Sequence, residues 1–442
     1  MNPTMTRYLP ADDVQRVVLH DEIHTRPSAT FKLPALIVYV AVLNKGVSSA
    51  SELAHLQQLP SQIDLQPRMM KGNFLQLQCG HYKVIWERHT EFTRYTMVQP
   101  LPTHAKWGSQ LPELASFVAT GPEWLRGIPG ETITAIHLAM LNEGMDDPDA
   151  FFKARQWLGE GTVIGSKMGR TAGHQSHSHL MTNLRIGDDG FERMLVLAAP
   201  DTSENRSGRI AQRLLELETY RIMSLLSLPM AKTLAAKLTQ SELRLVEIND
   251  RLERKIDKDE QLLDDLAGLA AQVESTTAEN SFRFSAARAY DAIVQQRIAE
   301  MREQPLSGIQ TVGEFMQRRL APAMATVNAT SERLLALAQR VARASQLLRT
   351  RVDIATETHN QKLLEKLTKG QAMQLRLQTT VEGLSIAAIS YYVVSLTFYL
   401  GKAFQAYGVN VSPEMVAGFS TPVVLFICWR MVQKIHRSLR NE

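Results

Sequence analysis

The sequence of 442 residues has little cysteine and no excess of charge of one sign. Its two cysteines, Cys79 and Cys428, are too few for a disulfide framework, which favours a reducing compartment. The 49 Lys and Arg residues nearly balance 45 Asp and Glu residues, so nucleic acid is not expected as a partner. The N-terminal residues MNPTMTRYLPADDVQ contain no apolar segment, so no secretory signal peptide is expected.

Short motifs of catalytic and nucleotide-binding sites are also absent from the sequence. It contains no GxGxxG, P-loop, GxSxG, HExxH or CxxC pattern, so we expect neither an enzyme nor a cofactor. The mean hydropathy of −0.16 and the 44% of hydrophobic residues are those of an ordinary folded chain, which excludes a disordered protein and a many-span transporter.

Residues 1–200 mix strand-like and helical patterns. Residues 33–43 form a β-branched apolar run, and residues 74–79 alternate apolar and polar side chains. We expect an α/β or α+β domain in the cytoplasm with a sheet of roughly six to eight strands. Further candidate strands are residues 82–86, 92–98, 132–138, 162–166 and 191–198.

Long helical patterns follow the mixed domain. Leu, Ala, Arg, Glu and Gln dominate residues 207–310, and their apolar spacing predicts a helical hairpin or coiled coil. Residues 312–382 predict a long stalk helix, with Pro322 near its start. A helix of that length exceeds what one globular domain can cover, which indicates a stalk or a bundle within an oligomer.

Two uncharged runs near the C-terminus predict a transmembrane hairpin. Residues 383–401 carry no charge over 19 positions, more than a buried core helix usually has, and 413–432 contain a second apolar run. The loop 402–412 joins them, and residues 433–442 form a basic tail. Lys and Arg flank the hairpin on one side, so the positive-inside rule predicts both termini in the cytoplasm and the loop outside. The lipid bilayer is then an expected partner.

Six stretches of the sequence resemble a bacterial family of uncharacterised membrane-anchored proteins, known as a domain of unknown function. They are LHDEIHTRP (19–27), WERHTEFTRYT (86–96), GRIAQRLLELETYRIMSLLSLP (208–229), SFRFSAARAY (281–290), LLRTRVD (347–353) and QLRLQTTVEGLSIAAISYY (374–392). The resemblance covers nearly the whole chain and implies an anchor in the bacterial inner membrane, but no activity.

The order of the segments is similar to that of the CorA-type divalent-cation channel superfamily. Those proteins place a Gly-Met-Asn tripeptide after the first span of a pentamer. Here Gly408 and Asn410 match that tripeptide, and Val409 replaces the Met. The resemblance implies a homo-oligomer, a pentamer if CorA-like, that passes an ion.

Small and hydroxylated side chains recur at helical spacing on the first span. They could line a hydrated path, or they could serve helix packing and the aromatic belt at the membrane surface. Lys402 would repel divalent cations at a pore mouth. The candidate pore and loop residues are Tyr392, Ser395, Tyr399, Lys402, Gly408 and Asn410.

Two polar clusters occur in the cytoplasmic domain. Each could supply metal ligands or an acid–base pair, but a network of Arg–carboxylate pairs is the simpler interpretation. The clusters contain His20, Glu22, His24 and Arg26, and Glu87, Arg88, His89 and Glu91.

A histidine-rich segment and one helix complete the candidate residues. His174, His177 and His179 could bind a metal ion, although a flexible polar loop is the simpler interpretation. Within residues 209–226, polar side chains such as Glu216 and Glu218 indicate either a hydrogen-bond network, between subunits or between the domain and the helix, or a solvated helix face.

Two functions are therefore expected from different classes. The first is a CorA-like homo-oligomeric ion channel or transporter. The alternative is a non-conducting membrane-anchored scaffold or sensor whose cytoplasmic domain binds a partner or a small ligand.

Overall fold

The structure is a computed structural model that describes residues 13–16, 19–20, 28–62, 65, 72–143, 149–169, 177–406, 408 and 412–439. The chain divides into two compact units. The first comprises Met1–Ile256 and Asp264–Arg343, and the second comprises Asp257–Leu263 and Ala344–Glu442. The mixed sheet domain, the long helices after it and the two apolar helices confirm that part of the predicted architecture.

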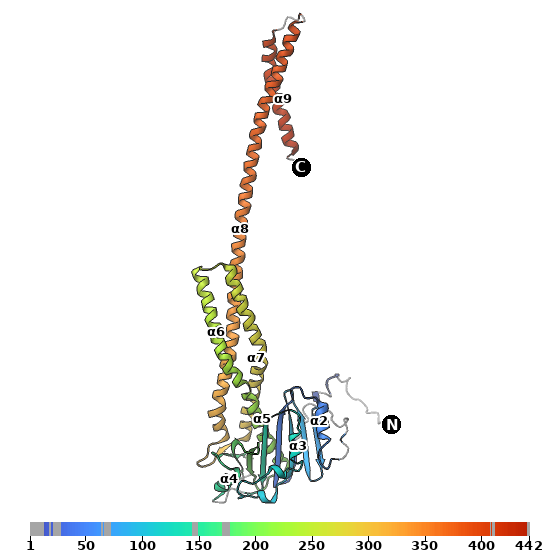
Figure 1. Ribbon diagram of the computed structural model, residues 1–442, viewed down its shortest axis with the longest axis vertical. Coiled ribbons are helices and arrows are strands. Elements are labelled where there is room, and N and C mark those ends of the chain that lie inside the picture. Colours follow the sequence, from blue (N-terminus) through green and yellow to red (C-terminus); the bar gives the residue numbers. More distant parts are fainter. Residues whose placement is uncertain are drawn as a thin grey trace, which may run out of the picture. The chain divides into compact units, whose positions relative to one another are not determined.

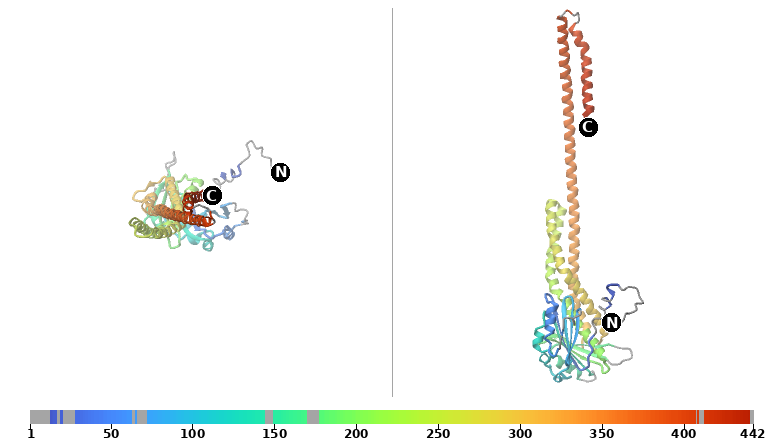
Figure 2. Two further views of the ribbon diagram at one scale, coloured as in Figure 1. Left: turned by 90° about the horizontal axis from the view of Figure 1, so that it is seen from above. Right: turned by 90° about the vertical axis from the view of Figure 1, so that its right-hand side faces the viewer.

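The first unit contains one mixed sheet, which is seen most clearly in Figure 2. Its described strands lie in the order β2-β3-β4-β1-β5-β8-β7-β6-β9, and all neighbours are antiparallel except β5 and β8. The strands are β1 (Ala35–Leu43), β2 (Phe74–Cys79), β3 (Tyr82–Arg88), β4 (Phe92–Pro100), β5 (Glu131–Leu141), β6 (Ile164–Met168), β7 (Ser178–Ile186), β8 (Glu192–Leu197) and β9 (Gln304–Pro305).

Strand β1 is buried on both faces, which explains its uninterrupted apolar sequence. Side chains of opposite parity point to opposite faces of a strand. Leu36 and Val38 belong to the hydrophobic core beneath the short helices, whereas Ile37 and Tyr39 line a cavity beside helix α5. The short helices are α2 (Ser49–Leu56), α3 (Pro122–Arg126) and α4 (Ala150–Leu158), with 3-10 turns at Thr103–Ala105 and Ala115–Phe117.

Strand β7 corrects one interpretation of the sequence. The histidine-rich segment was expected to be a flexible polar loop, but its last member, His179, lies within a strand. His179 pairs with Leu197 of β8 on one side and with Lys167 of β6 on the other. Because ladders on both sides satisfy the backbone, the end of the segment, Ser178 and His179, belongs to a strand, whereas His177 lies just before it.

Helix α5 (Glu204–Leu225) covers the face of the sheet opposite the short helices (Figure 1). Its N-cap is Ser203, whose hydroxyl accepts a hydrogen bond from the Arg206 amide. Near the start of the helix, a Cβ added at Gly208 would lie 1.5 Å from the Ala29 carbonyl oxygen. Only glycine allows this approach, and it brings α5 close to the segment before β1.

Three long helices complete the first unit. They are α6 (Ser227–Arg254), α7 (Asp259–Met301) and the beginning of α8 (Val312–Ala406), which run side by side in both views of Figures 1 and 2. Arg333 of α8 donates to Glu242 of α6 at 2.8 Å, and Arg288 of α7 donates to Ser331 of α8 at 3.1 Å. Helix α8 is continuous through the predicted stalk and the first apolar run.

In the second unit, the end of α8 packs against α9 (Pro413–Leu439), as both figures show. The hydroxyl groups of Thr397 and Ser420 are 3.1 Å apart. A Cβ at Gly401 would lie 3.3 Å from the Pro413 Cα atom, so the two backbones approach closely. Close packing through small residues and interhelical hydroxyl contacts is typical of helices in membranes.

Candidate functional site

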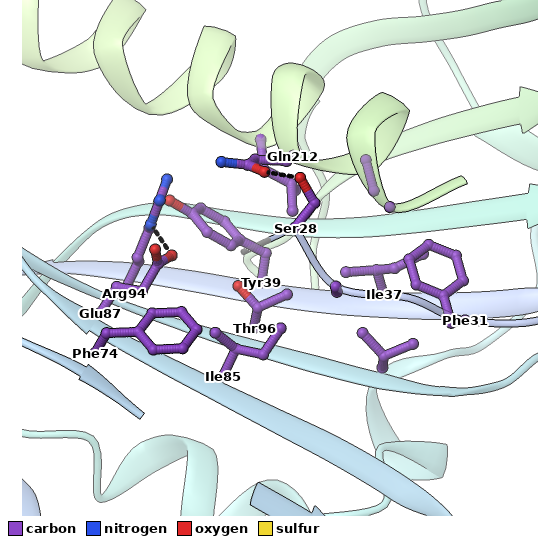
Figure 3. A pocket seen from close by; sticks show the side chains of 15 residues that line it. Ser28, Phe31, Ile37, Tyr39, Phe74, Ile85, Glu87, Arg94, Thr96 and Gln212 are labelled. Carbon is purple, nitrogen blue, oxygen red and sulfur yellow. Dashed lines mark hydrogen bonds and ion pairs between the residues drawn. The ribbon is translucent and has the colours of Figure 1, made fainter. Parts of the chain in front are cut away.

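The centre of the interface between the sheet and α5 is a buried charge, Arg94 of β4. Its guanidinium pairs with Glu87 of the neighbouring strand β3 and, at 3.3 Å, with Glu216 of α5. Figure 3 shows Arg94 beside Glu87, with Tyr39 and Gln212 close by. Although burial opposes the charge, the Glu87 carboxylate and its neighbours raise the pKa of Arg94, which therefore stays protonated.

The charged network continues from Glu216 to helix α7. Its second carboxylate oxygen accepts from Arg297 Nε at 2.7 Å, and Arg297 also donates to Glu300 at 2.8 Å. Arg213 Nε lies 3.3 Å from the same Glu300 carboxylate. Positive and negative groups alternate along this series of ion pairs, so each charge in it faces one of the opposite sign.

A second buried group of charges lies between β8 and α5. Glu218 pairs with Arg221, and the Arg221 guanidinium is 3.8 Å from Glu192. Burial, together with the nearby Glu218 charge, raises the pKa of Glu192 to about 8. Glu192 is therefore protonated near neutral pH, and one arginine serves two carboxyl groups.

A small cavity adjoins the Arg94 network (Figure 3). Its volume is about 40 Å³, and Phe31, Ile37 and Ile85 contribute much of its wall. Ser28 donates to Gln212 at 2.6 Å across one end. A space of this size holds about one water molecule, so it cannot hold a metabolite. The chemistry of this network is therefore that of a buried polar connection between sheet and helix.

A larger cavity of about 340 Å³ lies beside the N-terminal half of α5. The end of β6 and the end of α7 form its other walls, where the Gly169 amide donates to the Met301 carbonyl at 3.0 Å. The charged residues that line it are Arg206, Arg209, Arg213, Arg302 and Glu300.

The second predicted polar cluster does not converge on one point. Glu87 faces α5, whereas Arg88, on the other side of β3, pairs with the buried Glu52 at 2.6 Å. His89 stacks on Phe92, with ring centroids 4.5 Å apart. Glu91 accepts hydrogen bonds from Arg283 and Tyr290 of α7. Arg88 and Glu91 thus hold this part of the sheet to helices α2 and α7, whereas Glu87 and His89 contact side chains of β4.

The first predicted cluster is described only at His20, which is exposed. Glu22, His24 and Arg26 lie outside the described residues, as does His174 of the histidine-rich segment. His177 Nδ1 is 2.9 Å from the Gly169 carbonyl oxygen. In the described part of the chain, no group of three or more His, Cys, Asp or Glu side chains could hold a metal ion.

The candidate pore residues lie at the end of α8 and just beyond it. Tyr392, Tyr399 and Lys402 are exposed in the second unit, and Ser395 is half-buried. The Lys402 ammonium lies 5.0 Å from the centroid of the Phe398 ring. Gly408 is in a turn, and Asn410 lies outside the described residues.

Sequence reasoning missed several charged residues at these sites. Arg94 and Arg297 look like ordinary surface charges, since nothing in their local sequence indicates burial. The one useful signal was the row of polar side chains on α5. Glu216 and Glu218 of that row are buried, at 5% and 1% exposure. This burial excludes the solvated helix face and supports the hydrogen-bond network between α5 and the sheet domain.

Comparisons with known proteins identify a family but no characterised relative. No curated protein and no solved structure matches the chain. One family pattern does match, over residues 11–439, and the chain therefore belongs to the family described as protein of unknown function DUF3422.

Proposed function

We propose that this protein is a membrane-anchored scaffold or sensor whose sheet domain binds a small ligand or a partner. The observation that carries the anchor is exposed apolar surface. Helices α8 and α9 each contain 18 residues apolar enough to cross a membrane, of which 6% and none are buried. Leu396 is 63% exposed and Phe419 is 81% exposed, so water would contact a continuous apolar surface.

The charges around the apolar segments support an orientation. Lys366, Lys369 and Arg376 precede the first, and Arg430 and Lys434 follow the second. Lys402 is the basic residue of the loop between them. By the positive-inside rule, the protein spans the inner membrane of a bacterium twice, with both termini in the cytoplasm.

The binding role rests on the first unit. Its sheet is held to α5 by a buried charge network that has no room for a substrate, whereas the larger cavity beside α5 is open and charged. The sequence carries no pattern of catalytic residues. Recognition of a ligand or partner near the membrane accounts for both features.

Truncation after Gly370 tests the anchor. The shortened chain keeps every residue of the first unit and loses both apolar segments. It should leave the membrane fraction and remain folded, as judged by circular dichroism of the soluble fraction. Continued sedimentation of the folded, truncated chain with membranes would contradict the anchor.

A second candidate function is a CorA-like homo-oligomeric channel. The observation that favours it is that Tyr392, Tyr399 and Lys402 are exposed although α9 packs against α8. A ring of copies would bury this face and place hydroxyl groups along a central path. The Lys402 charge favours an anion over a divalent cation.

Mass measurement and ion flux separate the two candidates. A pentamer whose ion flux in liposomes changes with Lys402→Ala supports the channel. A monomer or dimer, or flux equal to that of protein-free liposomes, supports the scaffold.

A further inference from the structure

Four arginines from two segments of the chain face one cavity in the first unit. Arg206, Arg209 and Arg213 lie on α5, and Arg302 follows α7. Glu300 is the carboxylate among the residues that line the cavity. The formal charge of the lining side chains is therefore strongly positive, although the whole chain is nearly neutral.

Most of this positive charge is not neutralised within the described residues. Arg213 lies 3.3 Å from Glu300, but Glu300 also pairs with Arg297 at 2.8 Å. Arg206, Arg209 and Arg302 form no ion pair with any carboxylate of the described chain. The cavity thus differs from the Arg94 network, in which the charges alternate in sign.

This arrangement is unfavourable without an anion. Arg206 and Arg209 are three positions apart on α5, and Arg209 and Arg213 are four positions apart, so like charges are neighbours on one helix face. Arg206 also lies in the first turn of the helix, where the backbone dipole favours negative charge. A bound anion would remove both costs, because it would place negative charge among the guanidinium groups.

Size and donor geometry narrow the class of anion. A volume of about 340 Å³ is at the lower end of the range for small-molecule sites. Guanidinium groups present paired N–H donors that match the oxygens of carboxylate and phosphate. Several such groups around one space suit a phosphate, since it has more acceptor oxygens and more charge than a carboxylate.

We propose that this cavity binds a small soluble anion that carries one or more phosphate groups, held by Arg206, Arg209 and Arg213. This inference deepens the proposed function, because it names the ligand class of the sheet domain. The inference rests on the proposed function in one respect, which is that the bound ligand acts at the membrane. Membrane attachment and ligand binding are measured separately, so either can fail without the other.

Calorimetric titration of the full-length protein in detergent tests the inference. One arm uses inorganic pyrophosphate, and the other uses short-chain dibutyryl phosphatidic acid as a soluble lipid headgroup. We expect pyrophosphate to bind and Arg206→Gln with Arg209→Gln to weaken it roughly tenfold or more, since two charge-assisted contacts are lost. Binding of the lipid analogue without binding of pyrophosphate would contradict the proposal that the ligand is a small soluble anion.

The matched control removes the same charge elsewhere. Arg319 and Arg340 of α8 are exposed and line none of the cavities described above. Arg319→Gln with Arg340→Gln should leave pyrophosphate affinity within about twofold, as exposed charges contribute little. An equal loss in both double variants would overturn the inference in favour of unspecific attraction, and so would the absence of binding to the wild-type protein.

A stability measurement guards against unfolding of the variant. Without ligand, the Arg206→Gln, Arg209→Gln protein should melt at or above the wild-type temperature, because repulsion between like charges is reduced. Pyrophosphate should raise the melting temperature of the wild type but not that of the variant. A variant stabilised by pyrophosphate as much as the wild type would contradict the assigned site.

Discussion

The guanidinium of Arg94 on β4 lies 3.3 Å from the carboxylate of Glu216 on α5, and both side chains are buried. The pair joins the sheet to a helix that follows it by more than a hundred positions. A buried charge that loses its partner is costly. The contact therefore favours the position of α5 on the sheet in which the two side chains meet. The position of α5 in turn places its arginines beside β6 and the end of α7.

Glu216→Gln tests the energetic role of the buried network. The amide keeps the shape of the side chain but loses the charge that faces Arg94 and Arg297, so unfolding free energy should fall by about 3 kcal/mol. Glu242→Gln is the control, because its partner Arg333 is 41% exposed, and it should cost less than about 1 kcal/mol. Equal losses in chemical denaturation would show that burial of the network is unimportant.

Gly208→Ala tests the close approach between α5 and the segment before β1. The added methyl would lie 1.5 Å from the Ala29 carbonyl oxygen, so the helix must move, and we expect a loss of about 3 kcal/mol. Gly268→Ala on α7 is the control, since nothing lies within 4 Å of its Cβ. That substitution should stabilise the protein by about 0.5–1 kcal/mol. Equal effects of the two changes would contradict the described packing.

The raised pKa of Glu192 should make the stability of the protein depend on pH. Its pKa is about 8 in the folded protein against an ordinary value of 4.5, because burial disfavours the carboxylate. Between these pH values the folded state binds the extra proton, so the contribution of Glu192 to stability falls as pH rises. Glu192→Gln should therefore remove part of the decline in melting temperature between pH 4.5 and pH 8. Parallel curves for wild type and variant would refute the raised pKa.

Leu396→Arg tests the membrane segment in the full-length chain. A charge at the centre of a span costs about 2.5–3.5 kcal/mol of insertion free energy, so less protein should resist alkaline extraction from membranes. Leu335→Arg is the control, because Leu335 is also exposed on α8 but belongs to the first unit. It should leave the extracted fraction unchanged. The idea fails if both variants behave as the wild type does.

Local patterns were sufficient for much of the fold. The apolar run of β1 and the alternation of β2 predict strands that the structure contains within two residues. The long helical spacing predicts α8, and the uncharged runs predict the apolar parts of α8 and α9. In each case the pattern extends over enough residues for burial on one or two faces to determine the structure.

Long-range contacts explain what the sequence did not show. β7 depends on ladders to β6 and β8, and its polar first residues, Ser178 and His179, give no local sign of that pairing. The local sequence around Arg94 is that of a surface charge in a strand. Its partner Glu216 lies on α5, and only the folded structure brings the two together. The local sequence around Arg206, Arg209 and Arg213 is likewise that of a solvated helix face. Their position opposite Glu300 and Arg302 emerges only when α5 and α7 are placed together.

The two native cysteines allow the most direct test of the membrane anchor. Cys79 is fully buried in the sheet core, whereas Cys428 lies on α9 within the second apolar segment. In membrane vesicles whose cytoplasmic face is outside, a water-soluble maleimide should not label Cys428 until detergent is added, because the reagent needs a thiol in contact with water. Cys428→Ser should abolish the label, which controls for Cys79. Rapid labelling of Cys428 by the water-soluble reagent in intact vesicles would contradict the membrane anchor.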